Sequence, residues 1–178
     1  MLRRAVFLDR DGVINRQVIR GGKPYPPEKL SDFEYLPGAV KGIRQLHNAG
    51  YLIIVVTNQP DVATGLQSKK VVQSMHDKLK VDQLCDEVKV CYHTDDDNCA
   101  CRKPKPGMII EAAVDWGIDL RASFMIGDRW RDIDAGESAG CFTFFIDYQY
   151  QERRPERPDA IVGSLDQAAE YIIHQIKT

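Results

Sequence analysis

Two aspartates spaced one apart, Asp9 and Asp11, directly follow the short apolar run of residues 5–8. A strand alternates its side chains, so the two carboxylates project to the same side where the predicted strand ends. So close together they repel each other, unless a cation lies between them or one keeps its proton. A hard divalent cation that prefers oxygen ligands, most simply Mg²⁺, would bind both carboxylates and remove this repulsion. The alternative is an ordinary turn after a strand, since Asp and Gly are common turn residues.

Further polar residues follow other predicted strands or begin helices. They are Thr57 and Asn58 after residues 51–56, Asp128 after residues 123–127, Asp132 one helical turn later, and Lys103 before a helix. Alone, Thr57 reads as a strand-ending turn, Lys103 as a solvated charge and Asp132 as a capping carboxylate. Because ligands bind at the carboxyl edge of a parallel sheet, the set together predicts a phosphate and metal site.

The elements that must position these residues alternate between strand-like and helix-like patterns. Strands are predicted at residues 4–8, 51–56, 87–91, 123–126, 142–146 and 160–162. Helices are predicted to begin near residues 38, 68, 106 and 131, and a last helix has an apolar face from Leu165 to Ile176. A long polar loop is expected after the first strand, and a surface loop at residues 149–158. The alternation predicts an α/β fold, a three-layer, doubly wound, mostly parallel sheet.

The composition is that of an ordinary globular protein. The chain has 178 residues, 43% of them hydrophobic, and a net charge of −2. We therefore expect a single domain over residues 1–178, with no electrostatic attraction to nucleic acid or to an anionic membrane. The basic start, residues 1–4, precedes an apolar run too short for a signal peptide, and no stretch approaches transmembrane length. A cytoplasmic monomer is expected.

Five cysteines, an odd number, argue for metal ligation or core thiols and against a disulfide framework. Cys91 and His93, followed by Cys99 and Cys101, offer four ligands for a tetrahedral Zn²⁺. With no position left open, such a zinc is structural, and it would fix the loop at about residues 91–101. The alternative is a reduced surface loop with incidental thiols.

The chain resembles the haloacid dehalogenase (HAD) superfamily of phosphohydrolases in its sequence motifs and in their order. These motifs are Asp9-Arg10-Asp11-Gly12, Thr57-Asn58, Lys103, and Gly127-Asp128 with Asp132. The resemblance covers about residues 4–147. It implies that Asp9 is the nucleophile that forms an aspartyl-phosphate, and that Asp11 is the general acid and then the base. It also implies Mg²⁺ on Asp9, Asp128 and the backbone carbonyl of Asp11, with Asp132 as a supporting residue that orients Lys103 or metal-bound water.

Residues 91–108 narrow the resemblance to a subgroup of this superfamily. Their motifs, Cys-x-His and then Cys-x-Cys-Arg-Lys-Pro-x-Pro-Gly-Met, are similar to those of the D-glycero-D-manno-heptose 1,7-bisphosphate phosphatases. Histidinol-phosphate phosphatases share this scaffold, and neither has a large cap domain. The resemblance implies a Mg²⁺-dependent phosphatase of a phosphorylated heptose in lipopolysaccharide precursor synthesis. It implies phosphate and substrate contacts from Thr57, Asn58, Gln59, Arg102, Lys103 and Arg129.

The substrate stays open because residues 60–65 depart from the run Ser-Gly-Ile-Ala-Arg-Gly that is usual in that subgroup. The arginine is lost at Thr64, and Asp61 is gained. An acidic pocket from Asp61 or residues 95–97 would suit the amino alcohol histidinol phosphate. A phosphatase of another small phosphorylated metabolite is a further alternative. A polynucleotide end phosphatase is disfavoured by the net charge of −2. A non-catalytic scaffold protein would be expected to have lost Asp9 or Asp11.

Overall fold

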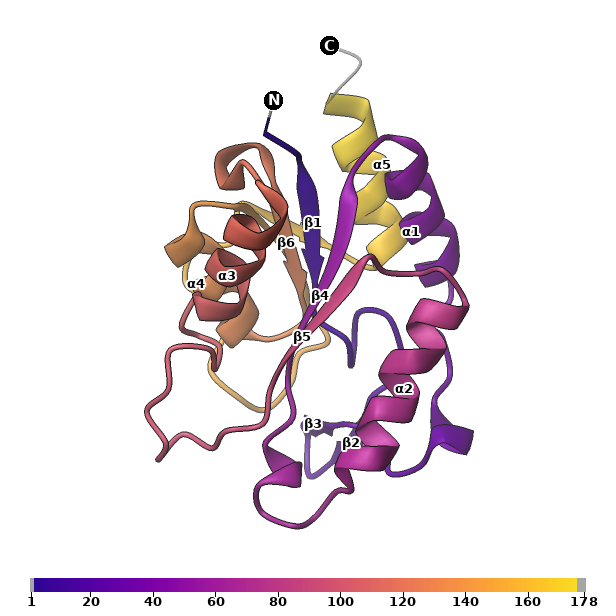
Figure 1. Cartoon of the computed structure of the whole chain (residues 1–178), viewed down its shortest axis with the longest axis vertical. Coiled ribbons are helices and arrows are strands. Elements are labelled where there is room, and N and C mark those ends of the chain that lie inside the picture. The colour runs from indigo at the N-terminus through magenta and orange to yellow at the C-terminus, as the bar shows by residue number, and fades with distance from the viewer. Residues whose placement is uncertain (1, 176–178) are drawn as a thin grey trace.

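Six parallel strands form the central sheet of the computed structural model, which describes residues 2–175 (Figure 1). The strands are β1 (Ala5–Leu8), β4 (Leu52–Asn58), β5 (Glu87–Cys91), β6 (Phe124–Gly127), β7 (Phe142–Ile146) and β8 (Ala160–Val162). Their order is β5-β4-β1-β6-β7-β8. The chain extends the sheet in one direction from β1 and then returns to build on its other side. Ligands bind at such a switch point, at the carboxyl end of β1.

Five helices cover the two faces of the sheet (Figure 1). One face carries α1 (Ala39–Asn48), α2 (Lys69–Val81) and α5 (Leu165–Gln175), and the other carries α3 (Gly107–Trp116) and α4 (Trp130–Ala139). The fully buried residues of β1 alternate between the two core clusters, with Val6 and Leu8 in one and Phe7 in the other. The predicted three-layer α/β fold is therefore confirmed. Ile176, predicted on the last helix, lies outside the described residues.

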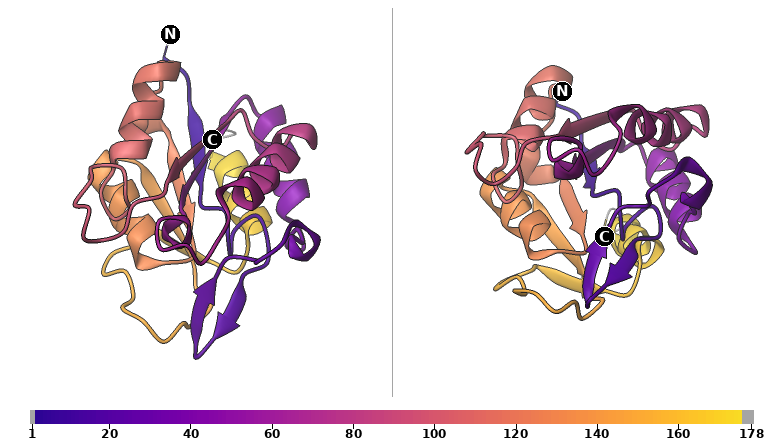
Figure 2. Two further views of the ribbon diagram at one scale, coloured as in Figure 1. Left: turned by 60° about the horizontal axis from the view of Figure 1, so that its bottom comes forward. Right: turned by 90° about the horizontal axis from the view of Figure 1, so that it is seen from below.

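The long loop expected after the first strand contains a β-hairpin, so that expectation was wrong in part. Strands β2 (Val18–Arg20) and β3 (Lys23–Tyr25) pair antiparallel. Gly21 and Gly22 connect them with φ values of 56° and 74°, the positive values that a tight two-residue hairpin turn requires. Figure 2 shows the hairpin projecting beyond the carboxyl ends of the sheet strands.

The remaining connections are short. Three 3₁₀ turns lie at Leu30–Asp32, Pro60–Val62 and Leu120–Ala122. Between β1 and α1 the described chain holds only the small hairpin and one such turn, and no large cap domain. None of the helices in residues 2–175 has the length and apolar character needed to cross a membrane.

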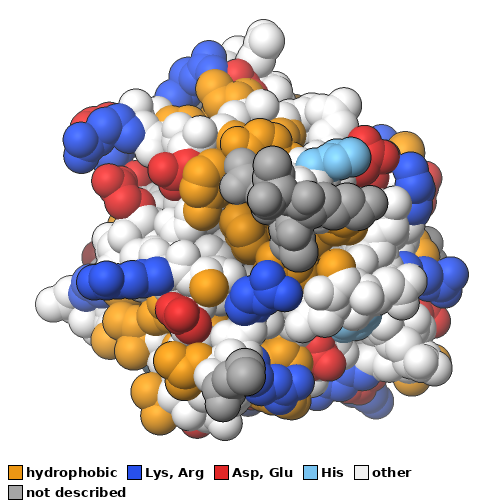
Figure 3. Space-filling view, turned by 90° about the horizontal axis from the view of Figure 1, so that it is seen from above, with side chains coloured by type: hydrophobic (Ala, Val, Ile, Leu, Met, Phe, Trp, Pro, Cys, Tyr) orange, Lys and Arg blue, Asp and Glu red, His pale blue; other side chains and the backbone are white. Residues whose placement is uncertain are grey.

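The end of the molecule at the amino ends of the strands carries charged side chains of both signs, dispersed among apolar ones (Figure 3). Such a mixture gives that face no concentrated basic patch of the kind that binds a polyanion. The opposite end, at the carboxyl ends of the strands, holds the residues that the sequence singled out.

Candidate active site

A cavity opens at the carboxyl edge of the sheet, where the predicted site residues meet. Its lining includes Asp9, Asp11, Thr57, Asn58, Lys103 and Asp132. These residues come from the ends of β1 and β4, from the loop before α3 and from the first turn of α4. The hairpin contributes Pro24, Tyr25 and Pro26 to the same cavity. The structure thus places residues separated by more than a hundred positions at a single site, as the parallel topology predicts.

Lys103 is a buried cation between two carboxylates. Its Nζ lies 2.8 Å from Asp9 Oδ1 and 2.6 Å from Asp132 Oδ1, and it donates a hydrogen bond to the carbonyl of Val56 at 2.7 Å. Burial disfavours the ammonium, but the carboxylates of Asp132 and Asp9 outweigh that cost and raise the pKa of Lys103. The side chain therefore stays charged although it is only 2% exposed.

Three carboxylates beside Lys103 concentrate negative charge in a buried space. Asp9, Asp128 and Asp132 each offer an oxygen, and these oxygens lie within 4.8 Å of one another. Burial and the charge of Asp132 raise the pKa of Asp9 to about 6, although Lys103 opposes the shift. Burial, with the charges of Asp9 and Asp132, raises the pKa of Asp128 well above its usual value. A cation bound between these two carboxylates would lower both pKa values again and favour their ionised forms.

One atom of this cluster is conspicuously without a partner. Asp128 Oδ1 is buried and accepts no hydrogen bond from any described residue. A buried carboxylate oxygen in that state costs free energy that a metal ion would recover. The all-oxygen donor set is the one that Mg²⁺ prefers. The residues present therefore fit a magnesium ion held by Asp9 and Asp128.

The side chain of Asp11 is held from three directions. Its carboxylate accepts hydrogen bonds of 2.9 Å each from Arg10, Asn15 and Gln59. Arg10 is fully buried, and its Nη1 lies 3.1 Å from Nε2 of His76 on α2. Burial and the nearby Arg10 charge lower the pKa of His76 to about 4, so His76 is neutral and accepts from the guanidinium. These contacts fix the orientation of the Asp11 carboxylate at the cavity.

Two residues expected to contact substrate are hydrogen-bonded to other site residues. Asn58 Nδ2 donates to the carbonyl of Lys103 at 3.0 Å, and Asn58 Oδ1 accepts from the Lys103 amide at 3.1 Å. The 1% exposed Gln59 donates to Thr57 Oγ1 at 2.9 Å as well as to Asp11, and it is not among the lining residues. Asn58 therefore ties the end of β4 to the loop that carries Lys103.

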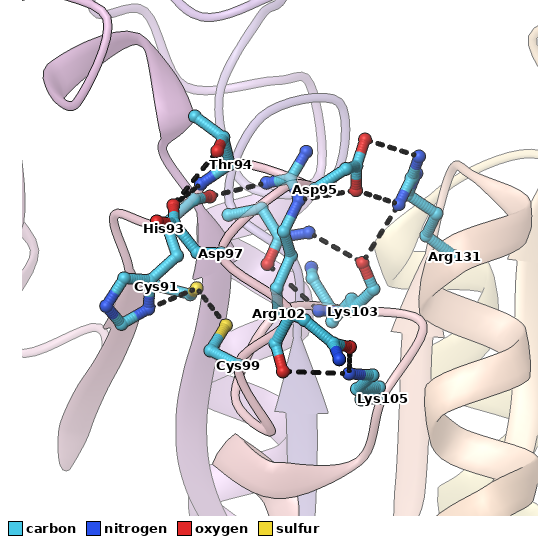
Figure 4. Close-up of polar contacts among 12 residues, drawn as sticks. Cys91, His93, Thr94, Asp95, Asp97, Cys99, Arg102, Lys103, Lys105 and Arg131 are labelled. Carbon is cyan, nitrogen blue, oxygen red and sulfur yellow. Dashed lines mark hydrogen bonds and ion pairs between the residues drawn. The ribbon is translucent and has the colours of Figure 1, made fainter.

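The four predicted zinc ligands lie together at the end of β5 and in the loop that follows it. Figure 4 shows three of them, Cys91, His93 and Cys99. Sulfur–sulfur distances among Cys91, Cys99 and Cys101 are 3.2 to 3.7 Å, and Nδ1 of His93 lies 3.3 Å from Cys101 Sγ. Four ligands around a tetrahedral zinc with Zn–S bonds of about 2.3 Å place their sulfurs about 3.7 Å apart. The cluster has the donor types and number of a structural Zn²⁺ site, although two of its sulfur–sulfur distances are shorter than this spacing.

Three arginines near the cavity are held by acidic side chains. Asp95 accepts from Arg102 Nε at 2.8 Å and from Arg131 Nη1 at 3.0 Å (Figure 4). The hydrogen bond from Arg102 is the main cause of a lowered pKa of Asp95. Arg129 donates from Nε to Glu152 at 2.9 Å. Arg129 and Arg131 line the cavity, whereas Arg102 lines an adjacent hollow that it shares with Lys103.

One further contact at the site was not predicted from the sequence. Residues 149–158 were expected to be a surface loop, but Tyr150 from this loop donates its hydroxyl to Asp128 Oδ2 at 2.6 Å. Burial and the Asp128 charge raise the pKa of Tyr150 far above its usual value, so the hydroxyl remains a donor. In the same loop, Glu152 binds Arg129. The loop has no periodicity that could have signalled these contacts.

The parallel sheet, with its carboxylate–lysine centre at the carboxyl edge, defines an HAD-type hydrolase, and residues 100–168 match the family model described as HAD-hydrolase-like. Among curated relatives, D-glycero-alpha-D-manno-heptose-1,7-bisphosphate 7-phosphatase of Photorhabdus laumondii is 38% identical over 78% of this chain and 81% of its own length. The beta-anomer enzyme of Rhodopseudomonas palustris is 40% identical over 78% and 80% of the two chains. This chain belongs to the HAD phosphatase family of these heptose-bisphosphate 7-phosphatases.

A solved structure is similar over nearly the whole chain. D,D-heptose 1,7-bisphosphate phosphatase from B. bronchiseptica, complexed with magnesium and phosphate, superposes with a TM-score of 0.82 at 30% identity. The alignment covers 97% of this chain and 99% of that one. The fold and the absence of a large cap are therefore shared with a phosphatase crystallised with Mg²⁺ and phosphate.

Proposed function

We propose that this protein is a Mg²⁺-dependent phosphomonoesterase that removes the 7-phosphate of D-glycero-D-manno-heptose 1,7-bisphosphate in the synthesis of lipopolysaccharide precursors. The observation that carries the proposal is the contact of Asp9 with Lys103, 2.8 Å long, beside the unpartnered oxygen of Asp128. A nucleophilic carboxylate, a buried cation and a carboxylate oxygen that can bind a metal ion are the parts that phosphoryl transfer requires. The names of the curated relatives supply the substrate.

The reaction proceeds in two displacements. Asp9 attacks phosphorus, the bond from phosphorus to the sugar oxygen breaks, and Asp11 gives its proton to that oxygen. Asp11 then takes a proton from a water that attacks the aspartyl-phosphate, which releases inorganic phosphate and restores Asp9. The three hydrogen bonds to Asp11 keep its carboxylate aimed at the cavity for both proton transfers.

Charge on the transferred phosphoryl group is balanced mainly by Lys103 and the metal site. Asp9, Asp128 and the backbone carbonyl of Asp11 would hold the Mg²⁺, which neutralises charge between carboxylate and phosphate when bound. Asp132 holds Lys103 in place through their 2.6 Å ion pair. Thr57 lies at the cavity, where its hydroxyl can donate to a phosphate oxygen while it accepts from Gln59.

The surroundings of the cavity favour an anionic substrate over an amino alcohol. Arg129 and Arg131 line it, and Arg102 lies beside it, so a second phosphate could accept hydrogen bonds that these arginines otherwise donate to Glu152 and Asp95. None of the acidic residues considered for an amine, Asp61 and residues 95–97, is among the lining residues of the cavity, and Asp95 is ion-paired with Arg102 and Arg131. Histidinol phosphate is therefore the weaker candidate.

The proposal also covers the zinc site, the domain and the location. The thiols of Cys91, Cys99 and Cys101 are free of disulfides in the structure, which suits structural Zn²⁺ and the reducing conditions of the cytoplasm. We propose one catalytic domain over residues 1–178, acting as a cytoplasmic monomer. Size-exclusion chromatography with light scattering tests the monomer, for which the chain mass is 20.2 kDa.

Phosphate release from a substrate panel tests the function. The panel contains both anomers of the heptose bisphosphate and histidinol phosphate, each with Mg²⁺, and Asp9→Asn serves as the blank. We expect preferential turnover of one heptose anomer, lost in the variant, with phosphate released from C7. Preference for histidinol phosphate, or no release from either heptose anomer, would refute the substrate assignment.

A further inference from the structure

The loop after β7 covers the aspartate that follows β6. Tyr150 in this loop donates its hydroxyl proton to Asp128 Oδ2 at 2.6 Å, and Asp128 Oδ1 has no hydrogen-bond partner among the described residues. One oxygen of this carboxylate thus accepts a hydrogen bond from the protein, and the other has none from the described residues. A carboxylate held by one oxygen cannot rotate freely, so the other oxygen keeps a fixed place.

Tyr150 is itself held by the hairpin. Gln17, just before β2, donates from Nε2 to the Tyr150 hydroxyl at 2.6 Å. The Gln151 amide donates to the carbonyl of Gly22 in the hairpin turn at 2.9 Å. A Cβ at Gly22 would lie 2.6 Å from the Gln151 side chain, so the hairpin turn and the loop are closely packed here. The ring of Tyr150 stacks on Tyr148 with centroids 5.6 Å apart. The β2–β3 hairpin and the loop after β7 therefore pack against each other next to Asp128.

We infer that Tyr150 is a positioning residue for the magnesium site, and that its hydroxyl, oriented by Gln17, holds the Asp128 carboxylate so that Oδ1 stays available to the ion. The inference rests on the metal site of the proposed function. Gln17 belongs to the segment that leads into the hairpin, and the hairpin lines the cavity. Through the contact of Gln17 with Tyr150, the affinity for Mg²⁺ would therefore also depend on the position of the hairpin. Loss of a partner that orients a metal ligand typically lowers metal affinity about 10- to 100-fold.

Metal binding without substrate is the test. Isothermal titration with Mg²⁺, and electron paramagnetic resonance with Mn²⁺ as the probe, would compare the Mg²⁺-free full chain, with its zinc retained, with Tyr150→Phe prepared in the same way. We expect the dissociation constant of the variant to rise about 10-fold or more. Tyr148→Phe is the matched control, since Tyr148 has the same ring stack but no hydrogen bond to Asp128. We expect it to bind metal like the parent chain.

A double-mutant cycle separates the hydrogen-bond chain from general loosening of the loop. Gln17→Leu should weaken Mg²⁺ binding less than Tyr150→Phe, and should add nothing in the Tyr150→Phe background, because Gln17 acts through that hydroxyl. Thermal unfolding without Mg²⁺ reports whether each variant folds. Equal Mg²⁺ affinity of the parent chain and a folded Tyr150→Phe would overturn this inference alone. No Mg²⁺ binding by the parent chain would overturn the metal site of the proposed function as well.

Discussion

Lys103 Nζ lies 2.8 Å from Asp9 Oδ1, and both side chains are almost completely buried. The pair is stabilising only as part of a larger group, because Lys103 also contacts Asp132 and the Val56 carbonyl. Removal of one member of such a buried group leaves the others desolvated and unpaired. Loss of one member of this group is therefore expected to destabilise the fold as well as to remove the proposed chemistry.

Replacement of Lys103 by methionine tests this dual role. Lys103→Met keeps most of the side-chain volume but leaves the carboxylates of Asp9 and Asp132 without their cation. We expect a loss of about 3 to 5 kcal/mol in the free energy of unfolding at neutral pH, measured by urea denaturation, together with loss of phosphatase activity. Lys105→Met is the control: Lys105 contacts Asn98 in the exposed part of the loop, and its loss should leave both quantities nearly unchanged.

The two proposed roles of Asp11 can be separated with different leaving groups. Asp11→Asn should lower kcat for a sugar phosphate about 10²- to 10⁴-fold, because an alcohol is a poor leaving group without a proton donor. With an aryl phosphate, whose phenolate leaves without a proton, the first displacement should persist and the second should be slow. Rapid-quench measurements are then expected to show a burst of phenolate in Asp11→Asn and none in Asp9→Asn. A steady-state rate without a burst would argue against Asp11 as the base of the second displacement.

The parts of this molecule that follow short-range rules were predicted from the sequence. Strands at residues 87–91, 142–146 and 160–162 match their predicted bounds, and β4 extends its prediction by two residues to Asn58. Apolar runs bounded by turn residues mark strands directly. Asp9 and Asp128 were placed together because they follow strands that the parallel topology makes neighbours.

The contacts that were missed join distant segments through residues without a local pattern. Tyr150 reaches Asp128 from 22 positions away, and Gln17 reaches Tyr150 from 133 positions away. Neither loop has a periodicity, so only the folded chain shows that they meet. The hairpin was missed for another reason: its strands are three residues long and one contains Pro24, although Gly21-Gly22 was a usable turn signal.

The zinc site is tested by metal content and by a matched pair of cysteine variants. We expect about one zinc per chain by elemental analysis, and loss of that zinc in Cys99→Ser. Thermal unfolding should then occur at a lower temperature, because binding free energy at a structural zinc contributes to folding. Cys85→Ser, which lies outside the cluster, should keep its zinc. A purified chain without zinc, or a Cys99→Ser variant that retains it, would contradict the assignment.

The contact of His76 with Arg10 predicts a specific dependence of stability on pH. Burial, and the charge of Arg10, lower the pKa of His76 from 6.5 to about 4 in the folded state. Between these values the unfolded chain binds more protons at this residue than the folded chain, so stability rises with pH. The stabilisation is complete above about pH 6.5 and is lost as the pH falls toward 4. The shift corresponds to at most about 3 kcal/mol.

Urea denaturation of the metal-free protein from pH 4.5 to 7.5 measures this effect by comparison with His76→Gln. Glutamine keeps an acceptor for the Arg10 guanidinium at 3.1 Å but takes up no proton. Asp9, with its raised pKa, has the opposite pH dependence, and because it is present in both proteins its contribution cancels in the difference. We expect the stability of His76→Gln to fall less steeply with acid than that of the parent chain, with His47→Gln as the control for removing a half-exposed histidine. Parallel curves for the parent chain and His76→Gln would show that His76 is not buried in its neutral form against Arg10.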